Sequence, residues 1–374
     1  MQKIGIIGGG QLGRMLVQAA KNLGFYTVVL DPTSNGPAAQ VADKEIVGDF
    51  KDASKIREVA EQVDFVTFEI ESANADALHD LVNEGKDINP HPKILEIIKD
   101  KYLQKKFLEE NGIPVAPSVA VENEEEIKKA AENFGYPFLL KARKDAYDGR
   151  GNALIRNEID IKEGIEKLKS RTLYIEKFVP FIKELAVVVG RSKDGEVKVF
   201  PTVETIHKNN ICHIVISPAP VEKSITQKAE ELATKIITDF KGVGVFAVEM
   251  FLTDKNELII NEIAPRVHNS GHHTIEGNET SQFEQHIRAI TGMPLGDTGH
   301  TAPFSIMINI LGERSGEVKL EGEEKLKEIK GATMHIYGKT ETRPERKMGH
   351  ITVVGDDLVE VLEKAKLARS IISI

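Results

Sequence analysis

The sequence predicts an α/β domain, a mixed α+β region after it and a small C-terminal unit. Two observations predict the α/β domain: a glycine cluster separates an apolar run from an amphipathic helix, and apolar runs then alternate with helical patterns. A third observation predicts the remainder, because strand-like runs dominate from Phe138 to about Leu311, with one helix near residues 226–240. From Ser305 a strand, a helix, two strands and a helix are expected.

The N-terminal segment has the rhythm of strand, helix, strand. Residues 3–7 form an apolar run, and residues 12–23 place leucine and alanine on one helical face that ends at Gly24. Two further apolar runs, residues 26–30 and 64–68, each follow a helical pattern. This alternation predicts a parallel sheet, whose strand carboxyl ends together form a ligand-binding edge.

Proline and glycine clusters divide the chain into domains. The proline-rich residues 89–92 cannot lie inside a helix, so the N-terminal domain is expected over residues 1–95. The loop-like residues 296–299 close a second domain, expected over residues 96–300, and a C-terminal domain over 301–374 follows. A chain of 374 residues has room for two or three domains with cores of their own.

Composition excludes several classes of function. With 49 basic and 58 acidic residues the net charge is −9, which disfavours binding to nucleic acid. Cys212 is the only cysteine, so neither an intrachain disulfide nor a multi-thiolate metal site is expected. No apolar run reaches the roughly 18 residues of a membrane span, and the N-terminus has no signal-peptide core. We therefore expect a cytoplasmic protein without a membrane or nucleic-acid partner.

The N-terminal glycine cluster suits a phosphate. Gly8, Gly10 and Gly13 fit the pattern G-x-G-x-x-G, and Asp31 ends the next strand about 20 residues later, as a dinucleotide site requires. Backbone N–H groups at such a turn bind any phosphate, however. This segment alone is compatible with a nicotinamide or flavin cofactor, with another phosphate and with a purely structural tight turn.

Four features of the second region suit a nucleotide. Lys141 lies within an apolar strand and needs an anionic partner there. The polar loop at residues 146–152 suits either closure over phosphates or a hairpin turn. Residues 173–180 predict a strand and an extended link whose backbone could hold a flat base, and Glu184 suits ribose hydroxyls or a surface salt bridge.

Two strand-like runs joined by residues 253–257 predict a β-hairpin. If Lys255 and Asn256 form a two-residue turn, Glu249 lies directly opposite Glu262. Facing carboxylates about 5 Å apart repel each other unless a proton or cation lies between them. Magnesium, which prefers oxygen ligands, would remove this repulsion. Solvated glutamates on an exposed face are the alternative.

The polar cluster at residues 264–274 follows this hairpin directly, at the kind of strand end where ligands are held. Arg266 and His268 suit a small anion, because a planar guanidinium matches a carboxylate or bicarbonate. Zinc is disfavoured, since no cysteine lies near His268, His272 and His273 and their spacing matches no common zinc pattern. A basic stretch farther along suits either a substrate phosphate or a solvated face: Lys339, Arg343, Arg346 and Lys347.

In this order, Lys141, the glycine loop, Glu176 to Val179, Glu184 and the facing glutamates resemble an ATP-grasp fold. More narrowly, the chain resembles the PurK family, the 5-(carboxyamino)imidazole ribonucleotide synthases of purine biosynthesis. The motifs that carry this resemblance are GGGQLGR at 8–14, YDGRG at 147–151, NEIAPRVHNSGH at 261–272, and Gly338-Lys339 with Arg346-Lys347-Met348-Gly349-His350. The resemblance runs from Lys3 to about Val354, essentially the whole chain.

The resemblance implies an ATP-grasp fold with an N-terminal Rossmann-like domain, a mobile lid subdomain over about residues 115–180 and a small C-terminal domain. It also implies ATP-dependent carboxylation of the exocyclic amine of 5-aminoimidazole ribonucleotide by bicarbonate, in de novo purine biosynthesis. Carboxyphosphate is the implied intermediate, and ADP and phosphate are products. The implied cofactors are ATP and magnesium, with manganese as an alternative, and a homodimer is expected.

The resemblance also assigns site residues, position by position. Magnesium would be held by Glu249 and Glu262, and the catalytic residues would be Arg266, His268, Lys141 and Asp148. ATP is expected to contact Lys101, Lys141, Ala146, Tyr147, Asp148, Gly149, Arg150, Gly151, Asn152, Glu176, Lys177, Phe178, Val179, Glu184, His207, Asn261 and Glu262. The imidazole ribonucleotide is expected to contact Gln11, Leu12, Glu71, Tyr147, Asp148, Arg266, His268, Asn269, Ser270, Lys339 and Arg346, the last two at its phosphate.

Two positions depart from related enzymes. Ala264 stands where many ATP-grasp enzymes have an asparagine, two residues after the second metal glutamate, so Asn261 or water is expected to replace that ligand. Lys101 stands where some relatives have arginine, which keeps the charge but loses a bidentate fork.

Three other functions compete with this interpretation. A formate-dependent glycinamide ribonucleotide transformylase shares the architecture, but the run of residues 269–273 and the loop at 147–151 favour the carboxylating family. An NAD-dependent dehydrogenase would explain the glycine cluster and Asp31, yet it gives Lys141 and the facing glutamates no role. A catalytically silent nucleotide-binding subunit would have lost catalytic residues, whereas this chain lacks only the asparagine at Ala264.

Overall fold

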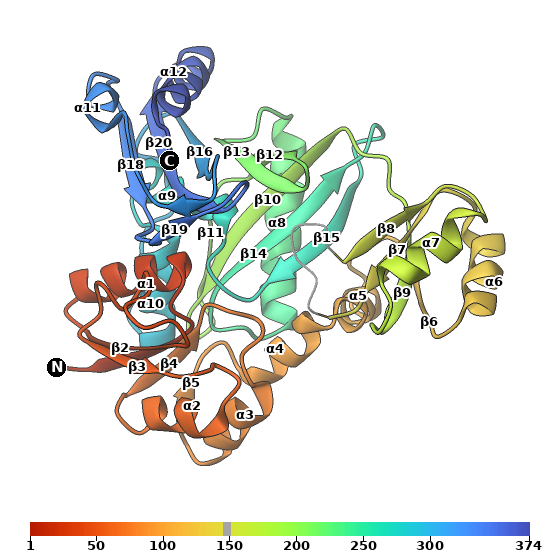
Figure 1. Ribbon diagram of the computed structural model, residues 1–374, viewed down its shortest axis with the longest axis horizontal. Coiled ribbons are helices and arrows are strands. Elements are labelled where there is room, and N and C mark those ends of the chain that lie inside the picture. The colour runs from red at the N-terminus through yellow and green to blue at the C-terminus, as the bar shows by residue number, and fades with distance from the viewer. Residues whose placement is uncertain (145–150) are drawn as a thin grey trace.

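The computed structural model describes residues 1–144 and 151–374, and its N-terminal part is a five-stranded parallel sheet (Figure 1). The strand order is β3-β2-β1-β4-β5, and every pairing is parallel. The elements are β1 Lys3–Ile7, α1 Gln11–Asn22, β2 Tyr26–Asp31, β3 Lys44–Val47, α2 Ala53–Ala60, β4 Phe65–Phe68, α3 Ala75–Asn83 and β5 Asp87–Ile88. The predicted parallel α/β sheet is confirmed.

The turn from β1 into α1 requires glycine at two positions. Gly8 has a φ of +101°, a conformation that L side chains rarely adopt. A Cβ added at Gly13 would lie 2.6 Å from the carbonyl oxygen of Gly8, so α1 packs directly on the turn. The buried face of α1 includes the predicted residues Leu12, Leu16, Ala19 and Ala20.

A four-stranded antiparallel sheet lies at the right of Figure 1. Its order is β6-β9-β7-β8, with β6 Ser118–Val121, β7 Phe138–Ala142, β8 Asn152–Ile155 and β9 Leu173–Lys177. Helices α6 Glu124–Phe134 and α7 Asp160–Lys167 share one hydrophobic core with it. The predicted lid, residues 115–180, contains these elements.

The largest sheet has nine antiparallel strands. Its order is β15-β14-β10-β12-β13-β16-β20-β18, and β11 pairs with β10. The strands are β10 Lys183–Arg191, β11 Val197–Val199, β12 Val203–Lys208, β13 Ile211–Ser217, β14 Gly244–Leu252, β15 Leu258–Ala264, β16 Phe304–Leu311, β18 Ala332–Ile336 and β20 Lys347–Gly355. Because β13 pairs with β16, this sheet is continuous across the boundary predicted at residue 300.

The C-terminal part has the predicted order of a strand, a helix, two strands and a helix, which are β16, α11, β18, β20 and α12. Helices α11 Glu323–Leu326 and α12 Leu358–Ile371 accompany the strands. Two short strands, β17 Gly316–Glu317 and β19 Glu341–Thr342, form a further two-stranded sheet.

The helices of the middle region differ from the prediction. Helix α8 Lys223–Asp239 matches the expected one, and α4 Pro92–Lys99 and α5 Lys101–Glu110 lie near the expected helix at the domain start. The expectation of a single helix between Phe138 and Leu311 is wrong, because α7, α9 Thr274–Gly277, α10 Gln282–Thr291 and the 3-10 helix η1 Asn269–Gly271 also lie there. Helix α10 buries polar side chains, Gln282, Gln285 and His286, which obscure its apolar periodicity.

Helix α10 joins the N-terminal domain to the large sheet. Its Phe283, Ile287 and Ile290 share a core cluster with Leu16 of α1 and Val245 of β14. The N-terminal glycine turn is thereby held near the hairpin of β14 and β15.

The turn of this hairpin differs from the predicted two-residue turn. The N–H of Thr253 donates to the carbonyl of Glu257 at 3.0 Å, and Asn256 has a φ of +59°. The loop therefore has three residues, with a left-handed residue at its end, where the sequence analysis assumed Lys255 and Asn256 alone.

A β-bulge restores the predicted pairing of the glutamates. The register pairs Met250 with Ile260 but Glu249 with Glu262, which leaves Asn261 as the extra residue on β15. The longer turn alone would have placed Asn261 opposite Glu249. The predicted pairing of Glu249 with Glu262 is thus confirmed, although its stated cause is wrong.

Candidate functional site

A cavity of about 530 Å³ lies between the four-stranded sheet and the large sheet. Charged side chains from both sheets line it. The predicted residues in its wall are Lys101, Lys141, Gly151, Asn152, Glu176, Phe178, Glu184, His207, Glu249, Asn261, Glu262, His268 and Asn269. The structure thus brings most of the expected nucleotide and metal residues together.

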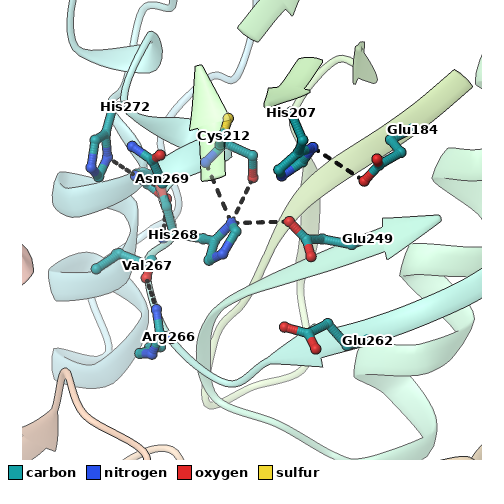
Figure 2. Close-up of polar contacts among 12 residues, drawn as sticks. Glu184, His207, Cys212, Glu249, Glu262, Arg266, Val267, His268, Asn269 and His272 are labelled. Atoms are coloured by element: carbon teal, nitrogen blue, oxygen red, sulfur yellow. Dashed lines mark hydrogen bonds and ion pairs between the residues drawn. The ribbon is translucent and has the colours of Figure 1, made fainter. Parts of the chain in front are cut away.

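Glu249 and Glu262 project from neighbouring strands into this cavity (Figure 2). Burial and the neighbouring Glu262 carboxylate raise the pKa of Glu249 to about 7. Burial disfavours the charged form of Glu262 as well, but the Lys101 ammonium, 2.5 Å away, lowers the pKa of Glu262 to about 2. Lys101 alone therefore does not offset both carboxylates, and the pair is suited to a further cation.

Lys141 belongs to a buried row of charges. Its ammonium lies 3.2 Å from Glu176, whose other oxygen lies 3.1 Å from Lys105. Burial raises the pKa of Glu176, but the two lysines outweigh it and hold that pKa below its usual value. The anionic partner that the sequence required for Lys141 is Glu176, and the row carries one positive charge in excess at the cavity wall.

Glu184 and His207 form an ion pair of 3.1 Å in the cavity wall (Figure 2). Burial lowers the pKa of His207, but the hydrogen bond and charge of Glu184 outweigh this and raise it. Glu184 therefore has a partner inside the site, whereas the alternative interpretation placed it in a surface salt bridge.

The loop after β15 carries the predicted anion-binding residues. Arg266 lies 2.9 Å from Glu71, which connects this loop to the N-terminal domain. Burial and the nearby Arg266 lower the pKa of His268 to about 3, so its imidazole is neutral at neutral pH. Its Nδ1 lies 3.0 Å from the Ser270 hydroxyl and 3.9 Å from Glu249.

The three histidines of this loop have separate partners. His272 contacts Gln282 at 3.1 Å and His273 contacts Ser305 at 3.1 Å, while His268 contacts Ser270. Among residues 1–144 and 151–374, no three histidine, cysteine, aspartate or glutamate side chains form a group suited to a metal. Asn269 instead exchanges amide hydrogen bonds with Asn309.

Carboxylates of the chain itself occupy the N-terminal glycine turn. The N–H of Gly9 donates to Asp31 at 2.8 Å, and the N–H of Gly10 donates to Glu69 at 2.7 Å. A dinucleotide pyrophosphate at these groups would have to displace both carboxyl groups from the N–H donors. The geometry therefore disfavours a nicotinamide or flavin site. The side chain of Leu12, a predicted substrate residue, lies in the core.

The basic stretch of the tail lies near this turn. Gln40 donates to the carbonyl of Gly338 at 2.8 Å, and Lys339 donates to the carbonyl of Lys347 at 2.6 Å. Burial and the charges of Arg346 and Lys347 lower the pKa of Lys339 to about 8. Clustered cations of this kind suit a phosphate, as the sequence suggested.

The predicted residues outside the cavity wall fall into two groups. Ala146, Tyr147, Asp148, Gly149 and Arg150 lie outside the described residues. Elsewhere on the chain, the following do not line the cavity: Gln11, Leu12, Glu71, Lys177, Val179, Arg266, Ser270, Lys339 and Arg346.

Sequence reasoning missed several groups around the cavity. Lys105 is buried in the charge row, and its position four residues after Lys101 on one helix was the available signal. The stacked rings of Phe181 and Phe251, 4.5 Å apart, were missed as well, and they line the cavity together with Lys347 of the predicted basic stretch. The two rings come from distant segments, so no local pattern could indicate their stacking.

The buried carboxyl of Glu69 makes stability depend on pH. Burial raises its pKa from 4.5 to about 7, so its contribution to stability is present below pH 4.5 and is lost as pH rises through 7. We expect the free energy of unfolding of Glu69→Gln, relative to wild type, to rise by about 3 kcal/mol between pH 4.5 and pH 8. Urea unfolding at both pH values measures this, with the exposed Glu61→Gln as control. A difference between variant and wild type that is the same at both pH values would contradict the assignment.

Comparison with known proteins gives matches along the whole chain. Three family models match: the ribonucleotide synthetase preATP-grasp domain over residues 1–99, the ATP-grasp domain over 106–283, and the phosphoribosylaminoimidazole carboxylase C-terminal domain over 305–364. The N5-carboxyaminoimidazole ribonucleotide synthase of Bacillus subtilis is 45% identical over 93% of this chain and 90% of its own. The chain spans about two thirds of the length of the curated phosphoribosylaminoimidazole carboxylases that it also matches.

Solved structures agree with these matches. The N5-carboxyaminoimidazole ribonucleotide synthetase of Thermotoga maritima superimposes with a TM-score of 0.91 at 46% identity, covering 100% of this chain and 99% of its own. The Aspergillus clavatus synthase, solved with ADP and 5-aminoimidazole ribonucleotide, gives a TM-score of 0.91 at 40% identity, covering 99% of this chain and 98% of its own.

Across the described residues, no helix is both long and apolar enough to cross a membrane.

Proposed function

The chain belongs to the N5-carboxyaminoimidazole ribonucleotide synthase family of ATP-grasp ligases, and from this premise we propose that it carboxylates 5-aminoimidazole ribonucleotide. ATP and bicarbonate would convert the exocyclic amine into a carboxyamino group, with release of ADP and phosphate. The relative solved with ADP and this ribonucleotide supports the choice of nucleotides. The proposed reaction belongs to de novo purine biosynthesis.

One observation carries the proposal: the facing carboxylates of Glu249 and Glu262 line the same cavity as the lysines Lys101 and Lys141. Lys101 and Lys141 would hold the phosphates of ATP, and Glu184 would meet the ribose. A bicarbonate oxygen would attack the γ-phosphorus while the bond to ADP breaks, which forms carboxyphosphate. Positioned cations stabilise the charge that spreads over the phosphoryl oxygens in such a transfer.

The carboxylates fit a magnesium ion, with manganese as an alternative. Glu249 and Glu262 offer oxygen ligands on one side of the hairpin, and burial together with the facing Glu262 carboxylate raises the pKa of Glu249. Asn261, the bulge residue that directly precedes Glu262, also lines the cavity and would complete the protein's part of the shell. When bound, the ion supplies charge neutralisation for the phosphates.

In the second step the amine would attack the carboxyl carbon of carboxyphosphate. The carbon–oxygen bond to phosphate breaks, and the departing phosphate can take the proton that the amine loses. Arg266 would orient the carboxylate through its guanidinium, and the neutral imidazole of His268 can accept a hydrogen bond. The low pKa of His268 makes it a poor proton donor at neutral pH.

The remaining assignments are part of the same proposal. The loop at residues 146–152 would close over the phosphates, and Glu176 to Val179 would hold adenine through the backbone. The ribonucleotide would lie between the glycine turn and the tail, with its phosphate at Lys339 and Arg346. We also propose the division at residues 95 and 300, bicarbonate as the carbon source, a homodimer and a cytoplasmic location.

The proposal predicts that ADP release depends on the imidazole ribonucleotide. Purified protein with ATP, magnesium and bicarbonate is assayed with and without that substrate, beside glycinamide ribonucleotide with formate. We expect release only in the first combination. Turnover with formate alone would transfer the assignment to the transformylase, and no turnover in either would overturn the proposal.

A further inference from the structure

Side chains of α5 bracket the β-bulge that carries Asn261 and Glu262. Strand β15 lies at the edge of the large sheet, so its outer backbone groups have no partner among the named strands. At Ile260 this edge forms an isolated bridge with Val115, and the Ile260 N–H donates to the carbonyl of Pro114 at 2.8 Å. Gln104 supplies the partner at Ile263: its amide donates to the Ile263 carbonyl at 3.1 Å and its oxygen accepts from the Ile263 N–H at 3.0 Å. On the other side of the bulge, Lys105 donates to the carbonyl of Ile260 at 2.9 Å.

The spacing of these anchors follows from the bulge. In a regular strand the outward-facing backbone groups belong to alternate residues, whereas Ile260 and Ile263 are three residues apart. The segment between the anchors therefore contains only Asn261 and Glu262. Without the bulge, Glu249 would face Asn261, and Glu262 would move to the buried face of the sheet.

Lys105 also connects this edge to the four-stranded sheet. Its side chain is 3% exposed, and its ammonium lies 3.1 Å from Glu176, which in turn contacts Lys141. Helix α5 lies where the two sheets approach each other (Figure 1). Lys105 thus contacts two parts of the candidate site. One is β15, the strand that carries the candidate metal ligand Glu262, and the other is Glu176, whose carboxylate also contacts Lys141.

We propose that Gln104 and Lys105 are positioning residues that fix Glu262 in the metal site and align Lys141 with it. This inference rests on the proposed function. In this assignment the two residues touch neither the phosphates nor the metal. They hold the backbone of β15 on either side of Glu262, and Lys105 also holds the carboxylate of Glu176 beside Lys141. Groups in such supporting positions typically change metal affinity about 10- to 100-fold when they are removed.

Gln104 and Lys105 are called the clamp below. Two variants test the clamp against one control. Lys105→Met removes the ammonium, Gln104→Ala removes both bonds to Ile263, and Lys106→Met removes a partly exposed charge one residue away. Manganese binding in the presence of ADP is measured by electron paramagnetic resonance, together with the steady-state constants. We expect both clamp variants to bind manganese at least about tenfold more weakly and to lose kcat, with an unchanged KM for the imidazole ribonucleotide.

The two variants also differ from each other in the expected result. Lys105→Met should raise the KM for ATP more than Gln104→Ala, because only the lysine contacts Glu176. Folded variants with the manganese affinity and kcat of Lys106→Met would overturn the proposal. If Lys105→Met fails to fold, Gln104→Ala decides; loss of folding in both would make the clamp purely structural and overturn its positioning role. Manganese binding and turnover by the wild type test the proposed function separately.

Discussion

Replacing Glu262 with glutamine is expected to lower ribonucleotide-dependent ADP release by at least about a hundredfold while the fold stays intact. The change removes one of the two facing carboxylates and replaces its charge with a neutral amide. Glu249 then remains alone opposite an amide, and Lys101 loses its ion pair. ADP release at saturating magnesium measures the loss, and thermal unfolding reports on the fold.

Glu257→Gln is the matched control for this variant. It makes the same chemical change in the same hairpin, but at an exposed turn position outside the cavity wall. We expect it to retain wild-type turnover. Wild-type turnover in folded Glu262→Gln would remove the metal assignment, and equal losses in both variants would point to damage of the hairpin.

Local pattern was sufficient for the N-terminal sheet. Apolar runs of strand length and an intervening amphipathic helix specify a parallel sheet almost by themselves. The hairpin shows the limit of such reasoning. Its turn has one residue more than assumed, and the bulge at Asn261 compensates for the shift, so the predicted partners of Glu249 and Glu262 were correct for the wrong reason.

Contacts between distant segments could not be predicted from the sequence. Lys105 and Gln104 appear as ordinary residues of a polar helix, and only the packed structure shows that they meet β15 and Glu176. Likewise, Asp31 fits a dinucleotide motif in the sequence, whereas in the fold its carboxylate accepts from Gly9. The sequence gives the residues of a motif and their spacing, but their contacts depend on the tertiary structure.

Helix α10 and the C-terminal strands illustrate a second limit. Buried polar residues such as Gln282 and His286 interrupt the apolar periodicity of α10 in the sequence. They can be buried because they form hydrogen bonds outside the helix, Gln282 with the N–H of His268 and His286 with Thr67. The loop before Ser305 marks the proposed domain boundary, and the strand after it, β16, still pairs with β13 of the large sheet. A composition change marks a loop and does not show whether a sheet ends there.

Lys141→Met is expected to lower kcat/KM for ATP by about 10²- to 10³-fold. The ammonium of Lys141 is the charge of the buried row that faces the cavity from β7, and methionine keeps its apolar stem. Glu176 keeps Lys105 as a partner, so the substitution does not leave a buried carboxylate without a cation. The fold should therefore survive, and the loss should fall on the ATP kinetics alone.

Lys162→Met on α7 serves as the control for Lys141→Met, because it removes an exposed charge from the same four-stranded sheet unit. Steady-state kinetics with ATP and with the imidazole ribonucleotide, and thermal unfolding, are measured for both. Only Lys141→Met should lose kcat/KM for ATP, since a lysine outside the cavity exerts little force on the phosphates through solvent. ATP kinetics like those of the control would exclude Lys141 from the phosphate site. Glu176, Lys105 and Lys141 would then form a purely structural group of ion pairs.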